Sequence, residues 1–178
     1  MECVEFYSKV AQEQACCDYA FHVVIAKYEK DKTEMEMAEV VQKYGINSFK
    51  VFMAYKDSLM LRDEEIINVF DACKKLGCLP MVHAENGDVI HFQENKLINY
   101  GITGPEGHLQ ARPENVEAEA TGNLSIFFSL CTNHKINFVF TGRAIMLANQ
   151  VRSPLYIVHI MSKGAANQVI LAKTKLIL

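Results

Sequence analysis

One lysine lies inside an otherwise apolar, strand-like stretch of the sequence. Lys50 occupies the middle of GINSFKVFMAYK, a run that begins with Gly45 and gives way to polar residues at Lys56-Asp57. Burial disfavours the protonated amine unless a partner compensates, and a neutral lysine can react with carbon dioxide to form a carbamate. A carbamate has two oxygens that can bridge metal ions about 3.5–4 Å apart. The alternative is that Lys50 faces away from the core and carries its charge to solvent.

Two histidines end strand-like runs in the same way. His83 closes LPMVH and His159 closes LYIVH, and a helical pattern follows each run. In a βα barrel, the residues at the carboxyl ends of the strands share one active-site mouth. Neutral imidazoles at such positions are good zinc ligands. A single strand-end histidine is more often structural, but two of them together with Lys50 favour a metal site.

Tyr55 follows Lys50 on the same run and is expected near the same mouth. Its hydroxyl could donate a hydrogen bond to an oxyanion that develops on a substrate carbonyl. Alternatively, its ring packs in the core and only the hydroxyl reaches water. The remaining histidines are given no role in this chemistry: His22, His91, His108 and His134.

Strands and helices alternate along the chain. Besides the Lys50 run, strands are expected at Asp18–Ile25, Leu79–His83 and Leu155–His159. Helices are expected at Thr33–Tyr44, Arg62–Leu76, from Gly87 to about Tyr100, Glu114–Ala120, Arg143–Val151 and Lys163–Lys173, with a long loop at Gly101–Pro113. This alternation indicates an α/β fold with a parallel sheet covered by helices. No GxGxxG follows a strand, which favours a TIM-type (β/α)8 barrel, of which 178 residues provide roughly half.

Composition restricts the classes of partner. The net charge is −3 and no basic run is present, which argues against nucleic-acid and anionic-membrane partners. The six cysteines form no CxxC pair, so reduced thiols in a cytoplasmic protein are expected. No signal peptide is visible, and the apolar region 124–140 is too short and polar to cross a bilayer.

Several longer strings identify a resemblance. GINSFKVFMAYKD, MVHAENGDVI, YGITGPEGH, ARPENVEAEA and SPLYIVHIMSK resemble the dihydropyrimidinase family of cyclic amidohydrolases, which includes the D-hydantoinases. The resemblance extends from about Ala15 to Lys173, apart from one segment. It implies strands three to six of a (β/α)8 barrel with a binuclear zinc centre. It also implies hydrolysis of the ring amide of dihydrouracil, dihydrothymine or hydantoins, and a homotetrameric assembly.

The resemblance also implies roles for individual residues. Lys50 is similar to the carboxylated lysine that bridges both zinc ions. His83 and His159 match the two histidines that bind the second metal ion. Tyr55 matches the substrate-binding tyrosine that stabilises the tetrahedral oxyanion. In this chemistry a metal-bridging hydroxide attacks the amide while zinc polarises its carbonyl.

The chain departs from the family pattern in two respects. The HxH motif of the first strand and the aspartate of the last strand have no counterpart, so residues 1–178 are interpreted as an incomplete metal-dependent barrel domain. We therefore expect this truncated form to be inactive or nearly so. The second departure is an atypical insertion at 122–141, GNLSIFFSLCTNHKINFVFT, with a Thr-Gly pair at each edge. Its removal would join two helical segments, which suggests translated non-coding sequence such as a retained short intron.

Two alternatives come from relatives with other functions. The collapsin response mediator proteins are non-catalytic members that assemble and bind cytoskeletal partners, and they resemble this chain at HAENGD and GITGPEGH. They typically lack the lysine, the tyrosine and the later histidine, whereas this chain keeps Lys50, Tyr55 and His159. Allantoinase and dihydroorotase are further candidates, which the AENGD and GITGPEGH strings disfavour.

Overall fold

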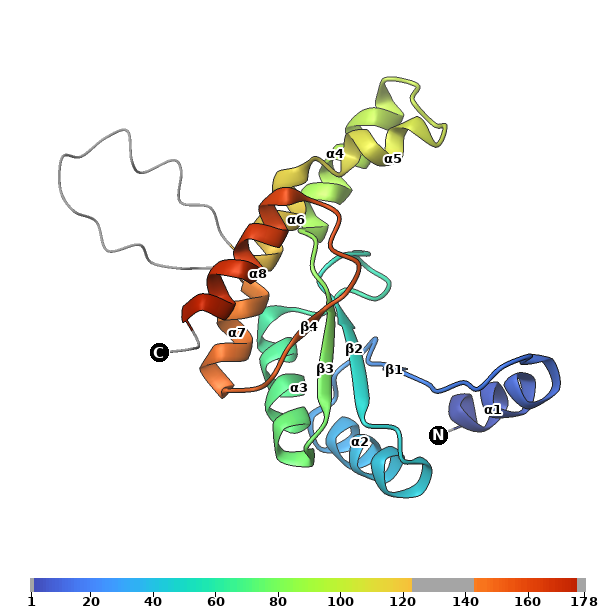
Figure 1. The fold of residues 1–178 in the computed structure, drawn as a ribbon. Helices are drawn as coiled ribbons and strands as arrows, with labels where there is room; N and C mark the ends of the chain where they lie inside the picture. The colour runs from blue at the N-terminus through green and yellow to red at the C-terminus, as the bar shows by residue number, and fades with distance from the viewer. Residues whose placement is uncertain (1, 123–142, 176–178) are drawn as a thin grey trace.

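The computed structural model describes residues 2–122 and 143–175 (Figure 1). The predicted insertion at 122–141 therefore lies, apart from Gly122, outside the described residues, as do Cys131 and His134. Five cysteines are described, and all five are free thiols. Within the described ranges, no helix combines the length and the apolar character needed to cross a membrane.

Four parallel strands form one sheet in the order of the sequence. These are β1 (Val23–Val24), β2 (Ser48–Phe52), β3 (Leu79–His83) and β4 (Tyr156–Ile157). Each strand pairs in parallel with the next one along the chain. A doubly wound sheet reverses its strand order at a switch point, whereas a barrel adds strands consecutively. The described strands follow the barrel order, which confirms the predicted α/β class and the partial barrel.

Strand β3 matches the prediction, whereas β2 ends at Phe52, so Tyr55 lies beyond the strand on which it was predicted. The two outer strands are also shorter than predicted. β3 has the predicted bounds, but β1 and β4 contain only two residues each. Pairing continues slightly beyond both, since the Ile25 N–H donates to Lys50 O and the Val158 N–H to Val82 O. His159 has a φ of 38°, so the chain leaves the extended conformation directly after β4.

Eight helices lie in the described part of the chain: α1 (Glu2–Gln14), α2 (Lys30–Tyr44), α3 (Asp63–Leu76), α4 (Gly87–Asn99), α5 (Glu106–Ala111), α6 (Glu114–Thr121), α7 (Arg143–Val151) and α8 (Lys163–Lys175). Helix α2 begins three residues before the predicted start, and α1 was not predicted. The loop prediction for Gly101–Pro113 was wrong in part, because α5 lies within it. Pro105 and Pro113 stop regular structure at the two edges of that segment but leave the residues between them free to form a helix.

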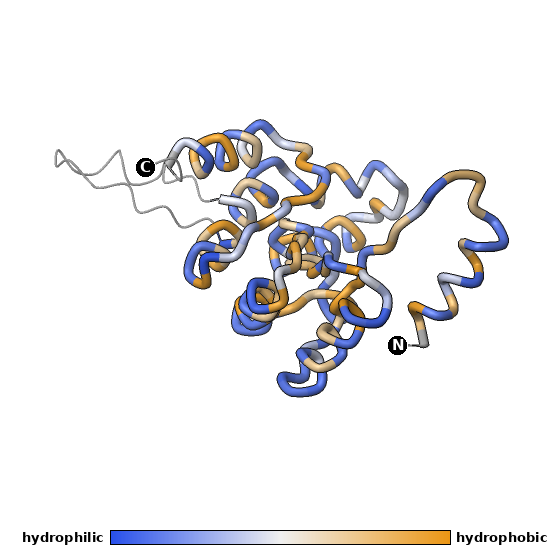
Figure 2. The backbone as a smooth tube through the Cα atoms, turned by 60° about the horizontal axis from the view of Figure 1, so that its bottom comes forward, coloured by the Kyte–Doolittle hydropathy of each residue, from blue (hydrophilic) through white to orange (hydrophobic). Residues whose placement is uncertain are grey.

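The main core lies between the sheet and helices α2, α3 and α7. Phe49 and Val51 of β2 and Val82 of β3 are fully buried and belong to one cluster with the apolar stripe of α3. That stripe is the predicted one: Ile66, Val69, Phe70 and Cys73. Figure 2 shows the hydrophobic stretches of backbone gathered at the centre of the molecule.

Helices α4 and α5 project beyond the carboxyl ends of the strands (Figure 1). The turn from β3 into α4 fits tightly against the end of β2. A Cβ atom added at Gly87 would come within 2.9 Å of the Ala54 Cα atom and of the Met53 carbonyl oxygen. The Gly87 N–H also donates to that carbonyl. Glycine is therefore required at this position, and the start of α4 is held next to the strand ends.

Candidate active site

Two imidazoles meet at the carboxyl end of the sheet. Strands β3 and β4 pair with Val82 opposite Ile157, so the residues that follow each strand lie side by side. The Nδ1 atom of His83 is 3.0 Å from the Nε2 atom of His159. The His83 side chain is buried, whereas His159 is exposed. These two residues, 76 positions apart in the sequence, present facing ring nitrogens to one point.

Lys50 lies on the same face of the sheet as His83. Side chains alternate between the two faces of a strand, so Phe49 and Val51 enter the helix-side core while Lys50 and Phe52 occupy the other face. Phe52 pairs with His83 in the register, and their rings stack with centroids 5.5 Å apart. The Lys50 Nζ atom lies 4.7 Å from the Phe52 ring centroid. The side chain is half-buried, so it is less enclosed than the sequence predicted.

Tyr55 lies in the loop that follows β2, next to the histidine pair. Its ring centroid is 5.1 Å from that of His83. Its φ is 64°, an unfavourable value for a non-glycine residue that costs about 1–3 kcal/mol. The turn compensates, because the Tyr55 carbonyl accepts hydrogen bonds from the N–H groups of Ser58, Leu59 and Met60. The residue is 43% exposed, so a small molecule can reach part of its side chain.

A carboxylate holds the far nitrogen of His83. Glu85 Oε2 lies 2.6 Å from the Nε2 atom of His83, and Arg112 Nε lies 3.7 Å from the same oxygen. Arg112 also pairs with Glu94 on α4 at 3.1 Å. The hydrogen bond from His83 and the Arg112 charge hold the pKa of Glu85 below its ordinary value, although burial opposes them.

The sequence analysis assigned no role to Glu85 or Arg112. The available signal for Glu85 was its place two residues after a strand-end histidine, within HAENGD. Arg112 carried no comparable signal, because its contact depends on the packing of α5 against α4. The neighbouring Asn86 has a structural role, since its Oδ1 atom accepts from the Val89 N–H at the start of α4 and its Nδ2 atom donates to Glu119.

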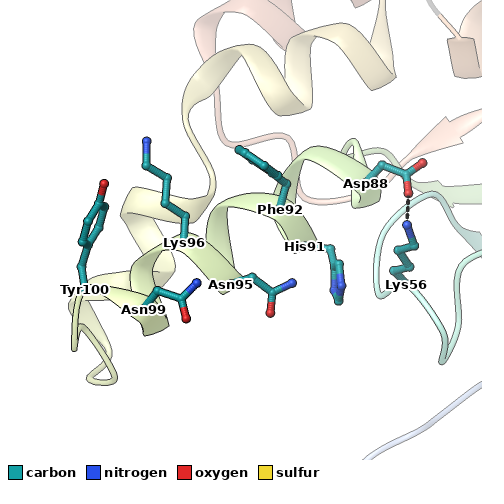
Figure 3. A pocket seen from close by; sticks show the side chains of 8 residues that line it. All are labelled: Lys56, Asp88, His91, Phe92, Asn95, Lys96, Asn99 and Tyr100. Atoms are coloured by element: carbon teal, nitrogen blue, oxygen red, sulfur yellow. Dashed lines mark hydrogen bonds and ion pairs between the residues drawn. The ribbon is translucent and has the colours of Figure 1, made fainter.

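Two hollows adjoin helix α4. The larger, of about 540 Å³, follows the exposed face of α4 between the Lys56–Asp88 ion pair and Tyr100, and also contains His91 and Phe92 (Figure 3). None of the predicted site residues lines it. The smaller, of about 250 Å³, lies between Tyr55 and Arg112. Neither His83 nor His159 lines this smaller recess, but Tyr55 lies next to His83 and Arg112 next to Glu85.

Lys50 is the third metal donor that the sequence predicts for this site. Across residues 2–122 and 143–175, no three His, Cys, Asp or Glu side chains are grouped as a metal site. Instead, two imidazoles meet at the strand ends, and the Lys50 amine lies on the same sheet face as His83, beside Phe52. This set fits a metal ion if the amine carries a carboxyl group, because two neutral nitrogens and one anionic oxygen form a usual zinc donor set.

Comparison with known proteins relates this arrangement to one class. No protein-family model matches the chain. The described fold superposes with a TM-score of 0.83 on the D-hydantoinase from Bacillus sp. AR9, at 34% identity, covering 98% of this chain and 34% of that one. The class that the fold and the site define is therefore that of the hydantoinase-type barrels.

Sequence comparison narrows the class to a family. The chain is 43% identical to the dihydropyrimidinase of Rattus norvegicus over 173 residues, which are 97% of this chain and 29% of that protein. It is 39% identical to the dihydropyrimidinase-related protein 5 of Mus musculus over 173 residues, 96% of this chain and 27% of that protein. The chain belongs to the dihydropyrimidinase and D-hydantoinase family, as predicted, and spans less than a third of the length of these curated relatives.

Proposed function

We propose that this chain provides part of the active site of a zinc-dependent cyclic amidohydrolase. The proposed substrates are 5,6-dihydropyrimidines, such as dihydrouracil and dihydrothymine, or hydantoins. The observation that carries the proposal is the meeting of the His83 and His159 imidazoles on the sheet face that also holds Lys50. The similarity to proteins named dihydropyrimidinase and D-hydantoinase supports the substrate class.

Lys50, His83 and His159 are the residues that would hold zinc. In the complete site, two zinc ions would be bridged by Lys50 in its carboxylated form. When bound, zinc supplies a Lewis acid and an activated hydroxide. The half-exposed position of Lys50 supports this role, since carbon dioxide can reach its amine. The described residues supply donors for one ion of such a pair.

Tyr55 is the proposed substrate-binding and catalytic group of this segment. Its ring lies against His83, and its exposed side chain borders the 250 Å³ recess. A phenol in this place can donate a hydrogen bond to the carbonyl oxygen as negative charge develops there. The strained backbone of Tyr55 supports a functional position, because unfavourable φ values concentrate at active sites.

A non-catalytic function is the second candidate. It is favoured by the 39% identity to a dihydropyrimidinase-related protein, a value close to that for the dihydropyrimidinase itself. In this case the chain would act in assembly and cytoskeletal binding as a collapsin response mediator-like protein. The presence of Lys50, Tyr55 and His159 together supports the hydrolase. A homotetrameric state and a cytoplasmic location remain predictions for both candidates.

The test is a chimera in which this chain replaces the matching segment of the rat dihydropyrimidinase. We expect dihydrouracil hydrolysis by the chimera and its loss in the Lys50→Ala variant. Added propionate should restore part of that activity, because its carboxylate can take the place of a carbamate. The matched control is Lys75→Ala, which removes an exposed lysine paired with Asp71 on α3.

The two candidates predict different outcomes. A folded chimera that hydrolyses dihydrouracil equally well with and without Lys50 would overturn the assignment of the metal donors. A folded chimera that forms the normal assembly but has no hydrolase activity would support the non-catalytic function.

A further inference from the structure

We propose that Glu85 and Arg112 are positioning residues that fix the ring of His83 in its metal-binding orientation, and that α4 and α5 hold them in place. The inference rests on the proposed function, because it concerns a ligand of that site. Arg112 also lines the small recess that Tyr55 borders. Glu85 contacts the His83 ring at Nε2, whereas the Nδ1 atom on the other side of the ring faces His159.

The first step concerns the two nitrogens of His83. Its Nε2 atom lies 2.6 Å from Glu85 Oε2, and both side chains are largely enclosed, with exposures of 7% and 16%. A carboxylate accepts but cannot donate, so Nε2 must carry the proton. In a neutral ring the lone pair is then on Nδ1. That atom is the one that faces Nε2 of His159 at 3.0 Å.

The second step concerns what holds Glu85. Arg112 follows α5 directly, and its side chain is only 15% exposed. Its guanidinium lies 3.7 Å from Glu85 and 3.1 Å from Glu94 of α4, so it connects two carboxylates from different elements. A buried guanidinium needs such partners, because an unpaired charge would be costly. The Glu85 carboxylate is therefore held on both sides, by His83 and by Arg112.

The third step concerns the role of the projecting helices. Helices α4 and α5 extend beyond the carboxyl ends of the strands (Figure 1). Arg112, which directly follows α5, nevertheless contacts Glu85 next to His83. The turn at Gly87 fixes the start of α4 against the end of β2. Through the cluster formed by Glu85, Arg112 and Glu94, the orientation of the His83 ring thus depends on the placement of α4 and α5. Hydrogen-bonded carboxylates behind metal-binding histidines typically contribute 10–100-fold to metal affinity.

The test compares four variants of the 178-residue chain with the unmodified chain. Glu85→Gln keeps the shape of the side chain but removes its charge, and Glu85→Ala removes the contact. Glu64→Gln is the matched control, because Glu64 is an exposed glutamate of α3 that pairs with Arg62. The first measurement uses the ¹⁵N chemical shifts of the His83 ring in the zinc-free chain. We expect the Nε2-protonated tautomer in the unmodified chain and in Glu64→Gln, and a mixture of tautomers in Glu85→Ala.

The second measurement is the affinity for Co²⁺, followed by its visible absorption in competition with a chelator. We expect a 10–100-fold loss in Glu85→Ala, a smaller loss in Glu85→Gln and less than a threefold change in Glu64→Gln. Arg112→Lys should weaken affinity by an intermediate factor, since a lysine cannot span two carboxylates in the same way.

The outcomes separate this inference from the proposed function. If the His83 tautomer is unchanged in folded Glu85→Ala, the positioning role is wrong, whatever the metal affinity. If the tautomer changes as expected but the unmodified chain binds no Co²⁺, Glu85 positions His83 and the metal assignment fails. If Glu85→Ala does not fold, the same two measurements on Glu85→Gln decide the question.

Discussion

The two faces of strands β2 and β3 differ in what they contribute. Toward the helices, Phe49, Val51 and Val82 are fully buried in one continuous apolar cluster with α3. On the opposite face lie two polar side chains, the half-buried Lys50 and the buried His83. Because side chains alternate along a strand, one residue packs in the core and stabilises the fold, while the next faces the candidate site. Substitutions on the two faces should therefore affect different measurements.

The largest expected effect is on the helix face. Phe49→Ala should lower the free energy of unfolding by about 3–5 kcal/mol, because it leaves a cavity between β2 and α3. Lys50→Ala, one residue away, should change it by no more than about 0.5 kcal/mol. Urea denaturation followed by circular dichroism measures both. Equal losses of unfolding free energy in the two variants would contradict this difference between the two faces of β2.

The corresponding change on the site face should affect activity and leave stability intact. Tyr55→Phe in the rat chimera should lower kcat by about 10²–10³-fold, the usual effect of removing one oxyanion donor. Its unfolding midpoint in urea should match that of the unmodified chimera. Tyr7→Phe, which changes an exposed tyrosine on α1, is the control and should retain full activity.

The turn at Gly87, where α4 begins against the end of β2, is sensitive to added volume. Gly87→Ala should destabilise the chain by about 1–3 kcal/mol, since the new methyl group meets backbone atoms of β2's continuation at Met53 and Ala54. Thermal unfolding measures the loss. Gly107→Ala is the control, because the nearest atom there is 3.5 Å away. A Gly87→Ala variant as stable as this control would contradict the close packing.

The last comparison is a pH dependence that belongs to the helix face and develops only above about pH 8.5. Burial raises the pKa of the Cys73 thiol to about 12. Between about pH 8.5, where a thiol of the unfolded chain ionises, and about pH 12, the folded state keeps a proton that the unfolded state loses. Cys73 therefore contributes stability that is complete below about pH 8.5 and is lost as the pH rises.

The measurement is the slope of unfolding free energy against pH across this range. One retained proton gives a decrease of up to about 1.4 kcal/mol per pH unit. Cys73→Ala should reduce the slope, whereas Cys16→Ala should not, because Cys16 is exposed. Identical slopes in the two variants would show that burial of Cys73 does not hold its proton.

Much of the fold could be predicted because its pattern is local. Strand β3 and helix α7 have their predicted bounds, and α3 begins one residue later, since apolar periodicity and terminal glycines are read directly from the sequence. The short outer strands could not be predicted, because their length depends on a partner strand and, in β4, on the φ of His159. Helix α5 was missed because the glycines and prolines around it indicated a loop.

The site could be predicted only in outline. Strand-end placement indicated that His83 and His159 would lie together, and parallel pairing brings them into contact. The contacts behind His83 could not be found in this way. Glu85 is adjacent in the sequence, but its bond to the ring depends on a side-chain rotamer, and Arg112 reaches it only through the packing of three helices and loops.

The pairing of β3 with β4 makes the distance between the two imidazoles independent of the length of chain that joins them. Backbone hydrogen bonds keep neighbouring strands about 4.8 Å apart. The described part of the connection between β3 and β4 contains four helices, α4 to α7. Residues can thus be added to an outer part of that connection that does not include Glu85, Arg112 or Glu94, without changing the pairing of the two strands. This makes the β3–β4 connection the natural place to graft a reporter domain onto the protein.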